Sequence, residues 1–237
     1  MPGEKPFPGA RAESLSIPFL KKPAQSTVLR RLSSIEPDAR QFWRWLQAKL
    51  RKEKLVDDSD VLLDATTIEP VLFARVNESV LERFNGCNFG KKVVEKRWFF
   101  GRKVHLMSAP NGTMVSFRIT AGNIHDRRVF HRIVKPKNKE VTADSGYRGV
   151  KRAQGQKLKL TKPFSQEKRQ RQLNGKRVGA ERVFNALKKL GLEHGVLVKT
   201  ARSLGSQILA VLTCLLGIQY LNLKKRRKPL TYAAFLL

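Results

Sequence analysis

Two short, largely apolar runs, each followed by an aspartate, constrain the fold of this sequence more than any other feature. Residues 61–63 precede Asp64, and residues 141–143 precede Asp144. Runs of this kind are typical of strands buried within a sheet. A carboxylate at the end of a buried strand is costly to desolvate unless it is paired or binds a cation. Because ligands of open α/β sheets bind at strand ends, both aspartates are candidate functional residues.

The patterns around these runs predict a mixed sheet. Residues 100–120 are predicted to form a β-hairpin around a Pro-Asn-Gly turn at 110–112, and residues 158–160 a short strand. Residues 68–98 are basic and lack periodicity, so they are expected to form a long loop. Strands that alternate with helical segments indicate an α/β fold with helices on both faces of the sheet.

Three helices are predicted after the hairpin, over residues 126–134, 177–190 and 205–223. The middle helix carries an apolar stripe at helical spacing, formed by Ala180, Val183, Phe184, Leu187 and Leu190. The last helix contains an apolar run that is shorter than the roughly 20 residues that span a membrane, and this run includes Gln219 and Asn222. We therefore predict a buried core helix and no membrane partner.

The composition divides the chain into four segments. Residues 1–24 are rich in Pro, Gly and Lys and are expected to form a flexible basic arm. Residues 25–57 are predicted to be a short helical region, with a first helix at 28–35. This region is either the remnant of a DNA-binding domain or a packing element for the core. The core is expected at 58–223 and a basic tail at 224–237.

Electrostatics limit the partners of this chain. It has 48 Lys and Arg residues against 19 Asp and Glu, a formal net charge of +29 at pH 7. Such a surface favours a polyanion, and charge alone leaves nucleic acid, an anionic membrane and the ribosome open. The two cysteines, Cys87 and Cys214, lie far apart and lack the spacing of a zinc site.

A third carboxylate lies on the helix predicted at 177–190. At 100° per residue, Glu181 shares one polar face with Arg177 and Lys188. Three carboxylates that meet in a basic protein suit Mg²⁺, which takes a few carboxylates together with water and phosphate oxygens. Two such ions about 4 Å apart clamp both oxygens of an in-line displacement at phosphorus. The simpler interpretation is that Glu181 only forms helical ion pairs with the two cations.

Several other residues have both a structural and a functional interpretation. His125 and Asp126 are candidates for ordering the site, although an aspartate here is more often a helix N-cap. Tyr147 is expected either to stack on a base or to pack under its loop. His105 alternates with apolar neighbours and is expected on the opposite face of the sheet.

These residues occur in motifs that resemble those of the DDE transposases of bacterial insertion sequences. The three acids lie in Leu-Asp-Ala-Thr, Asp-Ser-Gly-Tyr and Arg-x3-Glu-x6-Lys, and two further segments resemble the family's strand-two and post-hairpin motifs. In chain order the segments are 63–66, 101–106, 123–126, 144–147 and 177–188. The resemblance extends over roughly residues 58–220.

The resemblance implies a ribonuclease-H-like fold and a transposase that cuts DNA at transposon ends and joins the new 3′-OH to target DNA. It implies that Asp64, Asp144 and Glu181 are catalytic and hold Mg²⁺ or Mn²⁺, as two ions. Contacts with DNA are expected for Arg177, Lys188, Tyr147, Arg102 and Lys103. The implied partners are double-stranded DNA and a second copy of the chain, in the bacterial cytoplasm at the nucleoid.

Two departures and two alternatives accompany this hypothesis. Asn174 stands where the family motif has a tyrosine, and the segment between Leu160 and Arg177 is too short for the large β insertion of some relatives. A ribonuclease-H-like nuclease that cuts without joining would use the same acids. A truncated or degenerate copy would only bind DNA. A basic ribosome-associated protein would leave the three acids unexplained.

Overall fold

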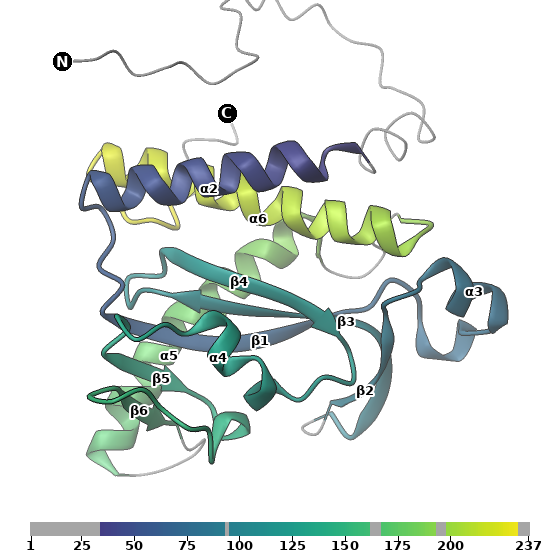
Figure 1. Cartoon of the computed structure of the whole chain (residues 1–237), viewed down its shortest axis with the longest axis horizontal. Helices are drawn as coiled ribbons and strands as arrows, with labels where there is room; N and C mark the ends of the chain where they lie inside the picture. The colour runs from purple at the N-terminus through teal and green to yellow at the C-terminus, as the bar shows by residue number, and fades with distance from the viewer. Residues whose placement is uncertain (1–33, 93–94, 162–166, 193–197, 232–237) are drawn as a thin grey trace, which may run out of the picture.

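The computed structural model describes residues 34–92, 95–161, 167–192 and 198–231. They form a mixed sheet of six strands flanked by helices (Figure 1). The strands are β1 (Asp60–Ile68), β2 (Asn88–Lys92), β3 (Arg97–Ser108), β4 (Met114–Ala121), β5 (Glu140–Ala143) and β6 (Lys157–Leu160). The helices are α2 (Glu36–Lys52), α3 (Glu78–Arg83), α4 (Phe130–Ile133), α5 (Lys168–Leu187) and α6 (Ala201–Lys224). Short helical turns are η1 (Phe73–Arg75), η2 (Asp126–Arg128), η3 (Ser145–Tyr147) and η4 (Lys188–Leu192).

The sheet is mixed, as the sequence predicts. Its strand order is β2-β3-β1-β5-β6, and β4 also pairs with β3. β3 is antiparallel to β1, β2 and β4, whereas β5 is parallel to β1 and β6 is parallel to β5. β1 and β5 are therefore parallel neighbours in the interior of the sheet. Asp144 follows the last residue of β5, as predicted, but the first strand does not end at Asp64: pairing with β3 carries β1 on to Ile68, and only the pairing of β1 with β5 stops at Leu63.

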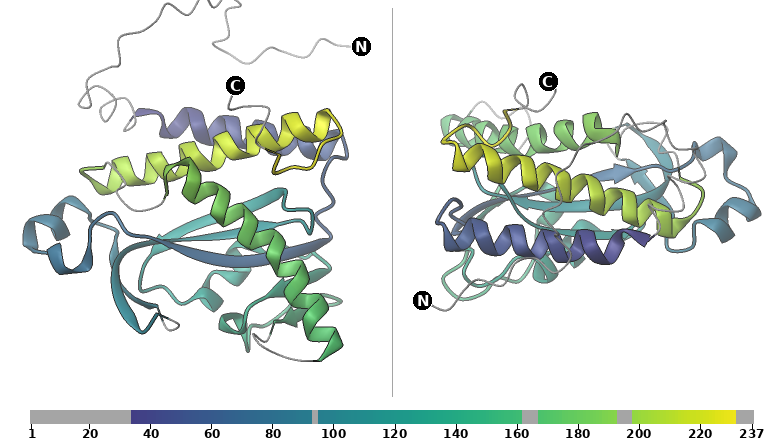
Figure 2. Two further views of the ribbon diagram at one scale, coloured as in Figure 1. Left: turned by 180° about the vertical axis from the view of Figure 1, so that it is seen from behind. Right: turned by 90° about the horizontal axis from the view of Figure 1, so that it is seen from above.

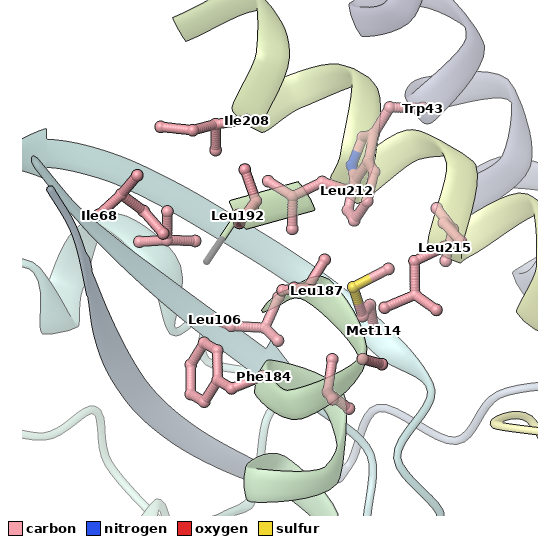
Figure 3. Close-up of a cluster of buried hydrophobic side chains, with 14 of the residues drawn as sticks. Trp43, Ile68, Leu106, Met114, Phe184, Leu187, Leu192, Ile208, Leu212 and Leu215 are labelled. Carbon is pink, nitrogen blue, oxygen red and sulfur yellow. The ribbon is translucent and has the colours of Figure 1, made fainter. Parts of the chain in front are cut away.

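Helices cover both faces of this sheet, which confirms the predicted α/β class. Val61 and Leu63 of β1 pack in one apolar cluster with Phe130 and Ile133 of α4. Ile68 belongs to a second cluster, which lies on the other face together with residues of α2, α5 and α6 (Figure 3). Figures 1 and 2 show α4 and α5 on opposite sides of the sheet. The alternation of side chains along β1 therefore supplies two cores.

The apolar stripe predicted on the middle helix is confirmed on α5, where Val183 and Leu187 are almost fully buried. The helix begins at Lys168 rather than Arg177, because buried Leu173 extends the stripe by two turns. It ends at Leu187, and η4 comes next as a π-helical turn that contains Gly191 at φ 106°. That backbone conformation favours glycine, so the regular helix stops earlier than predicted.

The apolar run near the C-terminus forms the core helix α6, as predicted. Its length and mean hydropathy of 1.6 are sufficient to cross a membrane, but 61% of the apolar window is buried inside the protein. The side-chain amide of Gln219 donates to the Gly112 carbonyl at 2.8 Å and accepts from the Met114 N–H at 2.9 Å. This pair of bonds ties α6 to the β3–β4 turn, where Gly112 has φ 89°.

α2 packs along α6, with Trp43, Leu46 and Leu50 buried in the core that α6 shares with the sheet (Figure 2). Gln47 of α2 donates to the Met114 carbonyl at 2.9 Å, so α2 and α6 hold the start of β4 together. The described part of the N-terminal helical region thus contributes packing to the core. The expected arm at 1–24 lies outside the described residues, as does almost all of the first helix predicted there.

Two predicted segments were wrong. Residues 68–98 do not form one long loop, because they contain η1, α3 and β2. β2 has no apolar alternation and exists through its antiparallel pairing with β3, which local sequence does not reveal. The helix predicted at 126–134 is split into η2 and the four-residue α4. The segment is too short to propagate a helix, and Pro136 stops it two residues after Val134.

Replacing Gln219 by Leu is expected to destabilise the fold by about 1–3 kcal/mol. The substitution leaves the Gly112 carbonyl and the Met114 N–H without their side-chain partners in a buried setting. Urea denaturation measures the free energy of unfolding. Leu221→Gln, at an exposed position of the same helix, is the control and is expected to change it by about 0.5 kcal/mol or less. Equal losses in both variants would contradict the clamp.

Candidate active site

The register of β1 and β5 brings the two aspartates together. Leu63 pairs with Ala143 across the two parallel strands, whose backbones lie about 4.8 Å apart. Asp64 follows Leu63 and Asp144 follows Ala143, so the two aspartates are neighbours. A small cavity where the pairing of β1 with β5 ends is lined by both aspartates and by Arg177 of α5. The aspartates predicted from the two apolar runs therefore share one site.

Asp64 is largely buried, and its Oδ1 accepts a hydrogen bond from the Ala65 N–H at 2.8 Å. Burial raises the pKa of Asp64 to about 6, and the neighbouring charges of Asp144 and Glu181 push in the same direction. Arg177 opposes this rise without cancelling it. The site therefore holds a carboxylate that is costly to ionise without a cation beside it.

Asp144 is fixed by the turn after β5. Its Oδ1 accepts a hydrogen bond from the Gly146 N–H at 2.9 Å, which caps η3. A Cβ on residue 146 would lie 3.0 Å from that oxygen and 3.5 Å from Oδ2 of Asp126, so glycine leaves room for both carboxylates. Burial, and after it the charge of Asp126, raises the pKa of Asp144.

Arg177 links the third acid to the first. Its Nε lies 3.5 Å from Oδ2 of Asp64 and 3.5 Å from Oε1 of Glu181. These two oxygens are therefore at most twice that distance, 7.0 Å, apart. α5 crosses β1 through its apolar stripe, which points the polar face of Arg177 and Glu181 toward Asp64. The side chain of Glu181 remains 53% exposed, so it has room to move.

A fourth carboxylate, Asp126, lies beside Asp144. Its Oδ1 accepts a hydrogen bond from Nζ of Lys103 at 3.0 Å and lies 3.9 Å from Nδ1 of His105. Burial, against the opposing charge of Asp126 and together with the charge of Lys103, lowers the pKa of His105 to about 4, so the ring is neutral at pH 7. His125, and not Asp126, caps η2. The alternation of His105 with apolar neighbours did not predict that His105 belongs to the site. The signal that could have found it is its spacing of two residues from Lys103, which places both side chains on one face of β3.

The other residues expected to contact DNA differ in their surroundings. Tyr147 has the second of its two expected placements, packed under its loop, because its side chain is only 1% exposed. Lys188 begins η4 and forms no ion pair with a carboxylate of the described residues. Arg102 does not face the acids and lines a separate groove near Arg202. Lys103 does reach the site, but through its ion pair with Asp126.

The mixed sheet, with two carboxylates on its central parallel strands and a third on the helix packed across them, defines a ribonuclease-H-like domain. A family model for the transposase DDE domain matches residues 57–216, and the chain belongs to this family. Members act on DNA and generally use divalent metal ions. No curated protein and no solved structure matches the chain.

The three carboxylates are of the chemical type that binds such ions, but in this structure they are not arranged around a single metal position. Asp64, Asp144 and Glu181 supply the carboxylate oxygens that Mg²⁺ and Mn²⁺ prefer. Within the described residues, no group of three or more His, Cys, Asp or Glu side chains is close enough to hold a metal ion. The positive charge of Arg177 stands between Asp64 and Glu181 instead. A metal ion would therefore replace Arg177 as the neutralising charge.

Asp64→Asn is expected to stabilise the metal-free protein at neutral pH by about 1–3 kcal/mol. The pKa of Asp64 is about 6 in the folded protein against 3.8 when unperturbed, so the folded state holds a proton that the unfolded state releases between these values. The stability contributed by protonated Asp64 is complete below pH 3.8 and is lost as the pH rises through 6. Asparagine has no such loss, so its advantage grows from about pH 5 to about pH 7.5.

Denaturation in EDTA at both pH values measures this difference. Asp57→Asn is the control with the opposite sign, because a backbone hydrogen bond from Ser59 lowers the pKa of exposed Asp57. A gain for Asp64→Asn that does not depend on pH would show that repacking, and not ionisation, causes it.

Proposed function

We propose that this chain is a transposase of the insertion-sequence type, which cuts DNA at the ends of a mobile element and joins those ends to target DNA. In the first step, water attacks the phosphodiester at the element's end and leaves a 3′-OH and a 5′-phosphate. In the second step, that 3′-OH attacks a target phosphodiester and displaces a target 3′-oxygen, so the number of phosphodiester bonds is conserved. The observation that carries the proposal is that Arg177 pairs with both Asp64 and Glu181, while Asp144 lies beside Asp64 on the neighbouring strand.

The three carboxylates would hold the divalent metal. When bound, such ions lower the pKa of the attacking water or hydroxyl and neutralise charge on the phosphate. Asp64 and Asp144 are suited to fixed coordination, because the sheet and two backbone hydrogen bonds hold them. Glu181 is exposed on a helix and is suited to complete the site when substrate is present.

Arg177 has a second role in this proposal. Its guanidinium now neutralises two carboxylates, and its Nε is buried without a hydrogen bond. Once metal takes over this neutralisation, the guanidinium is free to bind a DNA phosphate next to the scissile bond. Lys188, the residue immediately after α5, is proposed to contact the same strand. A pair of chains on the two element ends is the expected assembly.

Asp64→Asn, Asp144→Asn and Glu181→Gln are each expected to reduce Mg²⁺-dependent cleavage of an element end by at least about 100-fold, because changes in outer-shell residues alone cost about 10–100-fold. The exposed Asp57→Asn is the control and should cut at the wild-type rate. The rate is measured on a labelled duplex that carries the inverted repeat flanking the gene. Unchanged cleavage by Asp144→Asn would remove this site assignment.

A pre-cleaved end separates the transposase from a nuclease with the same fold. The duplex carries a free 3′-OH, and joining to a supercoiled plasmid is measured in Mg²⁺. Joined product supports strand transfer, whereas cleavage of intact ends without joining identifies the nuclease. A copy that only binds DNA would yield neither product.

Asp126 is proposed as a positioning residue for Asp144. Asp126→Asn removes the negative charge that faces Asp144 and holds Lys103, and it is expected to slow cleavage about 10–100-fold. It should also weaken Mn²⁺ binding, as measured by electron paramagnetic resonance, while leaving the melting temperature nearly unchanged. The exposed Asp57→Asn is the matched control, because it makes the same change from a carboxylate to an amide. Wild-type Mn²⁺ affinity in Asp126→Asn would exclude the positioning role.

A further inference from the structure

A groove lined by arginines runs along the free edge of β4, away from the three acids. It consists of two adjoining cavities of about 460 and 450 Å³, which share Arg40, Ile119 and Thr120 as lining residues. Its cationic residues come from α2, β3, β4, α4 and α6, and they are Arg40, Arg44, Arg102, Arg118, Arg132 and Arg202. We call this surface the arginine groove.

The composition of the arginine groove differs from that of the chain. The sequence contains 25 lysines and 23 arginines, yet all six cationic residues that line the groove are arginines. Arginine presents a planar fork that binds phosphate in a bidentate manner, whereas lysine acts as a point charge. The residue choice therefore indicates a ligand with phosphate geometry and not merely negative charge.

The arginines of the groove are poorly neutralised by the protein. Glu36 is the one carboxylate among the lining residues, and it pairs with Arg40 at 2.6 Å. Arg44, Arg118 and Arg132 are exposed and form no ion pair with any described residue. Like charges gathered in a hollow repel one another, so their free energy falls when a polyanion enters.

The backbone of the groove matches an extended ligand. Residues 116–121 of β4 line its floor over roughly 17 Å, at about 3.3 Å per residue. Arg40 and Arg44 lie one turn apart on α2 and share one side of it, while Arg118 and Arg132 lie on the opposite side of the floor. A length of roughly 17 Å corresponds to about five base pairs of duplex.

The groove is separate from the acidic site. β3 lies between β4 and β1, which spaces Arg118 and Ala65 about 10 Å apart in one row across the sheet. Arg118 pairs with His105 and shares the face of the sheet that α4 covers, whereas Asp64 pairs with Leu106 and shares the face that α5 covers. A phosphate bound at Arg118 therefore lies on the other face of the sheet from a phosphate at Asp64.

From these observations we propose that the arginine groove binds the sugar-phosphate backbone of duplex DNA, as a second DNA-contact surface beyond the acidic site. The choice of DNA as the polyanion rests on the proposed function, but binding in the groove needs neither metal nor an intact active site. Contacts to backbone phosphates carry no sequence information, so the groove holds DNA without selecting it.

The test measures binding of a duplex of about 30 base pairs and random sequence by fluorescence anisotropy, in EDTA, between about 50 and 200 mM NaCl. The groove variant is Arg118→Gln with Arg132→Gln. The control, Arg226→Gln with Arg227→Gln, removes the same charge beyond the far end of α6, about 35 Å along that helix from Arg202. The melting temperature of each variant, without DNA, checks that it is folded.

The groove variant is expected to bind about tenfold more weakly at about 100 mM NaCl, and its slope of log K against log salt should fall by about 2, because two phosphate contacts are lost. The control should lose less than about threefold. Arg118→Lys with Arg132→Lys should keep the slope but lose affinity, since bidentate contacts are replaced by point charges.

Equal losses in the groove variant and the control would overturn the proposal, because net charge alone would then explain binding. Wild-type duplex affinity in the groove variant, with weakened binding of single-stranded RNA or of an acidic peptide, would also overturn it. Because every measurement is made in EDTA, failure of DNA cleavage in the active-site tests leaves this outcome unaffected. Loss of groove binding, in turn, leaves the assignment of the three acids unchanged.

Discussion

The parallel pairing of β1 with β5 is the interaction on which the rest of this structure depends. It places Asp64 and Asp144 side by side where the pairing of two interior strands ends, and there the charge of Asp144 adds to the cost of ionising Asp64. Such a pair persists only with a cation nearby, and in this conformation Arg177 supplies it. For Arg177 to reach Asp64, α5 must cross β1 at a particular point along the strand and with a particular rotation about the helix axis. The buried apolar stripe of α5 fixes both the crossing point and the rotation. The exposed position of Glu181 has the same cause, because the polar face of the helix meets solvent beside Asp64.

The remaining elements keep this geometry fixed at a distance. α6 lies over the sheet and, through Gln219, holds the turn that sets where β4 starts against β3. α2 adds a third hydrogen bond at that turn through Gln47. β3 is the strand that connects the two halves of the sheet, since it pairs with β1 on one side and β4 on the other. It also carries Lys103 and His105 to the carboxylate of Asp126, so the support of Asp144 and the support of β1 come from one strand.

The sequence predicted those features that local pattern determines. The buried strands, the hairpin, the stripe of α5 and the core helix each result from the spacing of apolar residues over a few turns or strand positions. Features that depend on distant partners were not accessible in this way. β2 exists because β3 pairs with it, and Tyr147 is buried because Phe130 and the neighbouring loop cover it. The contact of His105 with Asp126 joins positions that the hairpin brings together, and periodicity along one strand does not reveal it.

The cationic residues behind the net charge of +29 are not equally available to bind DNA. Near the acids, Lys103 and Arg177 are already paired with carboxylates, so they contribute little free attraction for DNA until those pairs are broken. In the arginine groove, Arg44, Arg118 and Arg132 have no such pairs with described residues and are available to phosphate at once. An approaching duplex therefore gains more from the groove than from the acidic site, where the like charges of the carboxylates oppose it. This ordering suits an enzyme whose substrate must first be held as a polyanion and only then brought, with metal, against carboxylates that would otherwise repel it.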